Sequence, residues 1–331
     1  MLRACRSATL AGAVLLTLAA AGCGSSEDGD GKAPPAQPAP TAAAQDFPKP
    51  AGKSLGALQA GMAEGPVLSP TVSVLTPGRN RFGFGLFDVA RKEIAGAGAA
   101  LYIADADGSH VRGPYIARSE SLVVKPQFES RTTSQDPDSA KSVYVADVPF
   151  TKTGKYLVLA VARVDGRLLA TSQRSMEVLG SGNTPPKVGD RAPRIHTPTL
   201  ASVAGDATKI TTRVPPDVDL LKTDFADVLG KKPIVLVFAT PQLCVSRVCG
   251  PVVDIAAQVG AAVGSRVAFI HQEIFNDNDA SKGYRPQLRA YRLPSEPWFF
   301  VVDKAGRVAA RFEGAVSVGE LQRAVAKVTP R

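Results

Sequence analysis

The sequence predicts two folded domains in series, an all-β domain over residues 63–180 and an α/β domain over residues 187–331. In the first half, short β-rich runs alternate with turn-forming dipeptides, and no helical period lies between them. In the second half, continuous apolar runs alternate with amphipathic helical patterns. A segment rich in Gly, Asn and Pro, residues 180–186, separates the two patterns. At 331 residues and 44% hydrophobic composition, the chain is long enough and apolar enough for two cores.

The amino terminus has the composition of a secretory signal. Arg3 and Arg6 form a short basic region, and residues 8–21 are almost wholly apolar. Because a membrane-spanning helix needs about 20 apolar residues, this stretch is too short to cross a bilayer comfortably. We therefore predict a signal peptide over residues 1–22.

The signal ends in Ala20-Ala21-Gly22-Cys23, which resembles the lipobox of bacterial lipoproteins. The difference is Ala20, where leucine is usual. The resemblance implies that Cys23 becomes a lipidated first residue and anchors the protein to the extracytoplasmic face of the cell membrane. Acylation would attach more than one chain to Cys23, which is what stable anchoring requires. Cleavage after Ala21, with release of a soluble protein, is the alternative.

Residues 23–62 are rich in Gly, Ser, Ala and Pro, which predicts a disordered tether. The formal net charge of the chain is +9. Its basic side chains are spread along the sequence without a nucleic-acid-binding motif, so we expect no nucleic-acid partner.

The first domain is predicted to be an antiparallel sandwich of about seven short strands. The dipeptide Asp165-Gly166 between two such runs is typical of a hairpin. Gly154-Lys155-Tyr156 resembles the tyrosine corner of immunoglobulin-like domains, which implies an immunoglobulin-like sandwich. No catalytic constellation is visible here, which favours a scaffold or binding module. The expected strands are 71–75, 81–87, 99–103, 122–125, 142–148, 156–164 and 168–171.

The second domain is predicted to contain four strands and two long helices. The apolar run 233–238 is typical of a strand that is buried on both faces. The other expected strands are 267–270, 298–302 and 307–312. One expected helix carries an apolar face from Val252 to Val263, and the other covers residues 318–328.

Four sequence pieces in this order resemble the thioredoxin-like superfamily, particularly its extracytoplasmic redoxin branch. They are VGDRAP from residue 188, PIVLVFAT from residue 233, SEPWFFVVDKAGRV from residue 295 and RFEG from residue 311. The resemblance implies a thioredoxin-like fold with a cis proline, here Pro297, facing a pair of active cysteines. Trp298 is then expected beside those cysteines.

The cysteines expected in the folded part are Cys244 and Cys249, an even pair in a compartment where disulfides persist. Thioredoxins have two residues between their cysteines, whereas this pair has four. On one continuous helix such a pair lies about 140° apart, too far to bond easily. Pro251 is best tolerated in a first helical turn, so the helix is expected to begin near Val248, leaving Cys244 in the preceding loop within reach of a bridge.

The resemblance implies thiol–disulfide exchange with protein thiols and disulfides of the cell envelope, and it requires no cofactor. Which sulfur attacks is ambiguous from the residues, because Cys249-Gly250-Pro251 copies the start of the thioredoxin active sequence. Distance from the preceding strand and accessibility favour Cys244 as the nucleophile and Cys249 as the resolving cysteine. The alternative is a non-catalytic envelope adaptor whose disulfide is only structural.

Two further chemistries are less favoured. A peroxiredoxin needs threonine or serine three residues before its peroxidatic cysteine and proline seven before, where this chain has Pro241 and Val237. A copper chaperone would use His271 as a third ligand, although its spacing differs from that of SCO-type chaperones. Glu273 is a candidate acid for assisting proton transfer.

Overall fold

The computed structural model describes residues 42–180, 182, 184–244 and 247–329. Residues 38–331 belong to one compact unit. The predicted signal peptide, Cys23 and residues up to 41 lie outside the described residues. No helix in the described part of the chain is long and apolar enough to span a bilayer.

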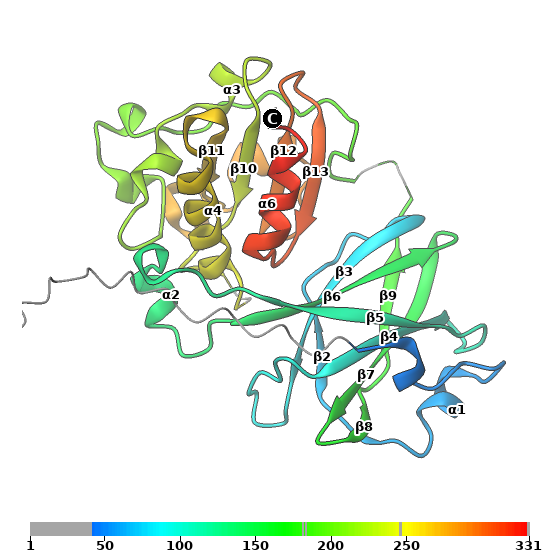
Figure 1. Ribbon diagram of the computed structural model, residues 1–331. Helices are drawn as coiled ribbons and strands as arrows, with labels where there is room; N and C mark the ends of the chain where they lie inside the picture. The colour runs from blue at the N-terminus through cyan, green and yellow to red at the C-terminus, as the bar shows by residue number, and fades with distance from the viewer. Residues whose placement is uncertain (1–41, 181, 183, 245–246, 330–331) are drawn as a thin grey trace, which may run out of the picture. The chain divides into compact units, whose positions relative to one another are not determined.

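The first region is a nine-stranded sheet with the order β1-β8-β7-β4-β5-β6-β3-β2, and β9 also pairs with β7 (Figure 1). The sheet curls at β5, because the first part of this strand pairs with β4 and its last part with β6. Apolar side chains from β3, β4, β6 and β7 form one buried cluster. The strands are β1 Ala63–Glu64, β2 Val67–Pro70, β3 Gly78–Phe87, β4 Gly98–Asp105, β5 Arg112–Ser121, β6 Ser142–Phe150, β7 Gly154–Val164, β8 Arg167–Ala170 and β9 Arg174–Val178.

Two of the expected strands are absent, and four that were not expected, β1, β2, β5 and β9, are present. Residues 71–75 form an irregular connection between β2 and β3, because the backbone N–H groups of Ser73 and Val74 donate to the carboxylate of Glu313 rather than to a neighbouring strand. Residues 122–125 follow the end of β5 and are also irregular. β5 and β9 were missed because polar residues and Gly113-Pro114 interrupt the apolar pattern.

The folded region begins earlier than the tether prediction allows. Phe47, Leu55 and Leu58 are buried in a cluster with apolar residues of β4 and β7. Leu55 opens the short helix α1, Leu55–Gln59, which is capped by the side chain of Ser54. The predicted disordered tether is therefore wrong from residue 47 to residue 58, because three apolar side chains there find a place on the sheet.

The second region contains a four-stranded sheet with the order β11-β10-β12-β13. β10 and β11 are parallel, while β12 is antiparallel to both β10 and β13. Each expected strand is present within one or two residues, and so are both expected long helices. The elements are β10 Ile234–Phe238, β11 Ala268–Gln272, β12 Trp298–Val302, β13 Val308–Glu313, α3 Phe225–Val228, α4 Cys249–Val263, α5 Pro286–Ala290 and α6 Val318–Ala326.

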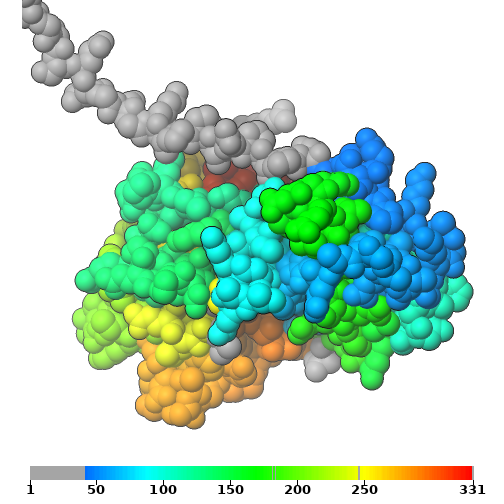
Figure 2. Space-filling view, turned by 90° about the horizontal axis from the view of Figure 1, so that it is seen from below, coloured from blue at the N-terminus to red at the C-terminus, as the bar shows by residue number. Residues whose placement is uncertain are grey.

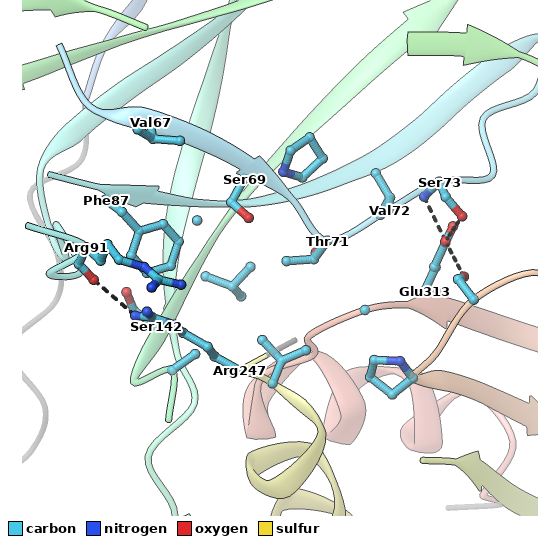
Figure 3. Close-up of a pocket in the computed structure, with 18 of the residues that line it drawn as sticks. Val67, Ser69, Thr71, Val72, Ser73, Phe87, Arg91, Ser142, Arg247 and Glu313 are labelled. Carbon is cyan, nitrogen blue, oxygen red and sulfur yellow. Dashed lines mark hydrogen bonds between the residues drawn. The ribbon is translucent and has the colours of Figure 1, made fainter. Parts of the chain in front are cut away.

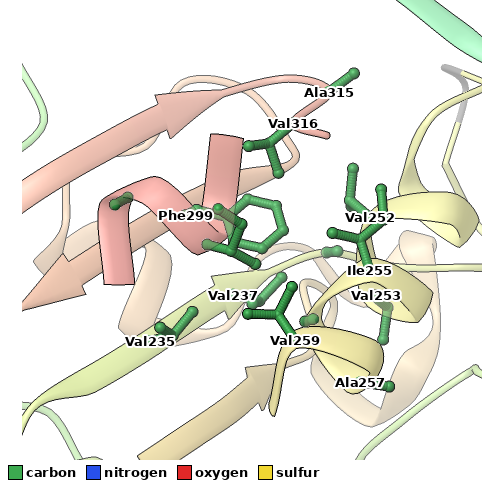
Figure 4. Packing of buried hydrophobic residues seen from close by; sticks show 14 of the residues in the cluster. Val235, Val237, Val252, Val253, Ile255, Ala257, Val259, Phe299, Ala315 and Val316 are labelled. Atoms are coloured by element: carbon green, nitrogen blue, oxygen red, sulfur yellow. The ribbon is translucent and has the colours of Figure 1, made fainter. Parts of the chain in front are cut away.

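Helices cover both faces of this sheet. On one face, Val235, Val237 and Phe299 pack against α4 and α6, as Figure 4 shows. On the other face, Leu236 and Phe300 pack with side chains of α3 and α5. Because successive strand residues point to opposite faces, the continuous apolar runs fill both cores.

Polar contacts join the first region to the second. In Figure 2 the surface of the first region, coloured blue to green, adjoins that of the second region, coloured yellow to orange. Asp254 of α4 is fully buried and accepts hydrogen bonds from Ser130 and from Thr133 in α2, Arg131–Ser134. Glu320 of α6 forms an ion pair with Arg81 of β3 at 2.7 Å. These contacts hold α4, and with it the loop before α4, against the first region.

Candidate functional site

The two cysteines form a disulfide at the start of α4. Their Cα atoms are 6.2 Å apart. Val248 caps the helix, so Cys249 is its first residue and Cys244 lies in the loop that follows β10, as predicted. Pro251 occupies the first turn, where its missing N–H costs no hydrogen bond.

The two sulfur-bearing residues differ in accessibility. Cys249 is fully buried among the side chains that pack against α4, whereas Cys244 is partly exposed at the edge of the same cluster. A thiol at a helix amino terminus is favoured in its charged form by the helix dipole. The arrangement therefore offers one sulfur to an external partner and keeps the second behind it.

Pro297 lies next to this centre. The Glu296–Pro297 peptide bond is cis, as the resemblance implies, and β12 begins at the following residue. The carbonyl of Pro297 accepts a hydrogen bond of 2.8 Å from the backbone N–H of Gly314. This bond ties the proline loop to the end of β13.

The carboxylate closest to the sulfurs belongs to Glu296, which the sequence analysis did not single out. One carboxylate oxygen and the two sulfurs lie within 4.8 Å of one another. Burial, and then the negative charge of Glu273, raise the pKa of Glu296 to about 8, against the effect of the Thr240 N–H. Its Oε2 is buried, with no hydrogen-bond partner in the described structure. Its place directly before the cis proline was the available clue.

His271 and Glu273 serve other contacts. The Nε2 of His271 lies 2.9 Å from the carbonyl of Ala239, and its Nδ1 lies 3.3 Å from the hydroxyl of Thr211. Burial lowers the pKa of His271. Glu273 accepts a hydrogen bond from the N–H of Thr212. Among the described residues, the group able to hold a metal ion combines the two cysteines with Glu296, so the less favoured copper-chaperone alternative, with His271 as third ligand, gains no support.

The expected place of Trp298 beside the cysteines is wrong. Its side chain is stacked on Phe300, with 5.8 Å between ring centroids, on the sheet face opposite α4. Strand alternation gives the reason, because Phe299, the next residue, points toward α4 instead. The indole Nε1 donates to Ser295.

A groove of about 490 Å³ borders this centre (Figure 3). On the side of the second region it is lined by Val248, Glu296 and Pro297. On the side of the first region its walls include Val67, Ser69 and Phe87. The volume is in the range typical of ligand sites.

Comparisons with known proteins bear on the second region. No family model matches the chain, and no curated protein sequence matches it. A solved structure that does match is a thiol:disulfide interchange protein of the thioredoxin family from Chlorobium tepidum TLS. It is 17% identical, with a TM-score of 0.29, and the match covers 45% of this chain and 99% of that chain. A likeness this weak carries no argument about function. The strand order, the cis proline and the cysteine pair of the second region are features that the sequence resemblance to thioredoxin-like domains implies.

Proposed function

We propose that this protein exchanges disulfides with other proteins through Cys244 and Cys249. The observation that carries the proposal is the disulfide between a partly exposed and a fully buried cysteine at the start of α4, beside Pro297 and Glu296. A structural bridge needs neither the exposure of one sulfur nor a carboxylate beside it with one buried oxygen that lacks a hydrogen-bond partner in the described structure.

The exchange has two steps. In the reduced protein the thiolate of Cys244 attacks a substrate disulfide, so that a bond forms between Cys244 and one substrate sulfur while the other substrate sulfur leaves as a thiolate. The ionised form of Glu296, which a pKa of about 8 leaves as a minor fraction at neutral pH, takes the proton of Cys249, and the Cys249 thiolate attacks the sulfur of Cys244. This restores the Cys244–Cys249 bond and releases the second substrate thiolate. The substrate gains two electrons and the protein loses two; the reverse sequence oxidises a substrate dithiol.

Cysteine variants test the proposal. With a protein disulfide as substrate, Cys249→Ser is expected to accumulate a covalent mixed disulfide, because the resolving step is removed. Cys244→Ser is the matched control and is expected to accumulate none. Mass spectrometry of the non-reduced products measures both. Trapping through Cys249 alone would reverse the assigned roles, and trapping by neither variant would refute exchange.

The second candidate function is an envelope adaptor with a structural disulfide. It is favoured by the contacts of the cysteine loop, where the carbonyl of Arg247 accepts from the N–H of Ala140 and its guanidinium lies 3.3 Å from Asp138. The reduction potential separates the two functions. A value below about −300 mV favours the structural role, and a higher value favours exchange.

We place this function on the extracytoplasmic face of the cell membrane, with the protein anchored by lipid on Cys23. The basic and apolar residues before Ala20-Ala21-Gly22-Cys23 support this. Fatty-acid labelling of the wild type, lost in Cys23→Ser, tests the anchor. Labelling that persists in this variant would overturn it.

We further propose that residues 63–180 are an immunoglobulin-like sandwich domain. The hydroxyl of Tyr156 donates to the carbonyl of Lys152 at 3.1 Å, a bond back to the preceding turn that is typical of a tyrosine corner. Tyr156→Phe removes this bond and the one that the hydroxyl accepts from the N–H of Lys152 at 3.3 Å, and it is expected to lower the free energy of unfolding by about 1–2 kcal/mol.

A further inference from the structure

The groove of Figure 3 connects an edge of the first sheet with the candidate redox centre. β2 lines the groove and is the last strand in the order of the described sheet. At the other side, Glu296 lines the groove and lies within 4.8 Å of both sulfurs. A molecule in the groove would therefore extend from a strand edge to Glu296, beside the two sulfurs.

The walls near β2 carry unusually exposed apolar side chains. Val67 is 56% exposed and Val89 is 95% exposed, and they are two of only six large apolar residues that are exposed in the described part of the chain. The ring of Phe87 lies beside them in the groove. A strand edge next to apolar pockets fits an extended polypeptide, which adds to the edge through its backbone and fills the pockets with alternate side chains.

Of the charged side chains along the groove, the acidic ones receive hydrogen bonds from the protein, whereas one basic side chain has no partner among the described residues. Glu313 accepts hydrogen bonds from Ser73, Val74 and Ser295, so its charge is fully engaged. Asp88 accepts from the N–H of Lys92. The guanidinium of Arg91, by contrast, is exposed and has no ion pair or hydrogen bond with any described residue.

A second cation lies beside Arg91. The guanidinium of Arg247 is 5.1 Å from the centre of the Phe87 ring and donates to the carbonyl of Arg91 at 3.0 Å. Its partner Asp138 is 64% exposed, so water screens that pair. The end of the groove formed by Phe87, Arg91 and Arg247 is therefore apolar and cationic.

We infer that this groove binds an extended segment of the protein substrate, with an apolar side chain against Val67 and Phe87 and an acidic side chain at Arg91. The inference rests on the proposed function in one respect, namely that Cys244 attacks a disulfide of the docked substrate. Docking of the segment itself needs no disulfide exchange. The inference assigns a task to the first region, which supplies the strand edge, the apolar wall and the free cation. Substrate selection then resides outside the thioredoxin-like domain.

Docking is tested on the full chain in its disulfide form, with a fluorescent, cysteine-free peptide of alternating Val and Asp. A peptide of alternating Val and Lys is the comparison. Fluorescence anisotropy is expected to show the acidic peptide binding at least about 5-fold more tightly, with the preference shrinking at high salt. Arg91→Glu is expected to abolish or reverse the preference. Arg167→Glu makes the same charge change at an exposed hairpin position outside the groove and is expected to leave it intact.

Equal binding of the two peptides, no binding of either, or a preference that survives Arg91→Glu would overturn the inference. A dimer of the full chain that Arg91→Glu dissociates would assign the groove to a second copy and would also overturn it. Failure of the proposed function looks different. The Cys249→Ser variant would then trap no mixed disulfide even with a cysteine-containing acidic peptide, while the cysteine-free acidic peptide still bound.

Discussion

Two buried carboxylates close to the start of α4 have opposite surroundings. Asp254 is fully buried and receives donors on both oxygens, from Arg213 at 2.8 Å, Thr133 at 2.6 Å and Ser130 at 3.0 Å. Glu296 has a buried oxygen with no partner in the described structure. A satisfied buried charge holds elements together, whereas an unsatisfied one is costly unless it becomes neutral. The contrast assigns Asp254 to the interface between regions and Glu296 to chemistry.

The largest expected effect comes from Asp254→Asn. The change leaves the guanidinium of Arg213, which is only 7% exposed, without a charged partner. Breaking a buried pair in this way costs about 3–5 kcal/mol. Denaturant unfolding is expected to show this loss, while Asp219→Asn, at an exposed carboxylate, serves as the control with little change. A loss below about 1 kcal/mol for Asp254→Asn would show that Asp254 does not hold the two regions together, and so would contradict the difference drawn between Asp254 and Glu296.

The ionised carboxylate of Glu296 is expected to destabilise the folded protein, whereas that of Asp254 stabilises it, and this effect can be measured as a function of pH. The pKa of Glu296 is raised to about 8 in the folded protein, so the folded state holds a proton that the unfolded state has released above about pH 4.5. The stability that this proton supplies is complete below pH 4.5 and is lost as pH rises toward 8. The difference of about 3.5 between the folded and unfolded pKa values corresponds to at most about 5 kcal/mol of unfolding free energy, which the wild type is expected to lose, relative to Glu296→Gln, between pH 4.5 and 9.

Unfolding of the disulfide forms at pH 4.5, 6 and 9 measures this difference. Subtracting the pH profile of the glutamine variant removes the pH dependence that arises from the other titrating groups, because both proteins contain them. Parallel pH profiles of the two proteins would show that Glu296 is ionised in the folded state at neutral pH.

A smaller effect is expected on the exchange rate. The variant Glu296→Gln lacks the one carboxylate that the described residues place beside the sulfurs to take the proton of Cys249. Release of the second substrate thiol is expected to slow by about 10-fold or more, while formation of the first mixed disulfide is unaffected. Rapid-mixing kinetics of the two steps measures this. Slowing of the first step alone would assign Glu296 to Cys244.

The smallest effect is expected from Glu273→Gln. The charge of Glu273 contributes to the raised pKa of Glu296 after burial, so its removal should move the pH midpoint of Glu296 downward by about half a unit. The midpoint follows from the same unfolding series. An upward movement would contradict the sign of the interaction.

Local patterns located much of the candidate site in advance. The apolar run that became β10 and the position of Pro251 follow from neighbouring residues, while the cis proline at residue 297 follows from the resemblance to thioredoxin-like sequences. Glu296 was missed because no local pattern shows that a residue before β12 lies beside sulfurs about 50 residues earlier. Trp298 was misplaced because the choice between two sheet faces depends on the register of β12 against β10.

The order of strands and helices in the second region could be predicted from the amino-acid sequence, because strands buried on both faces require continuous apolar runs and helix starts require particular residues. The path of residues 71–75 depends on three-dimensional contacts, because Glu313 accepts from the backbone N–H of Ser73, 240 positions away. The same holds for which carboxylate borders the disulfide and which residues wall the groove. These features depend on contacts between distant segments, and the residues that form such contacts have no fixed spacing in the chain.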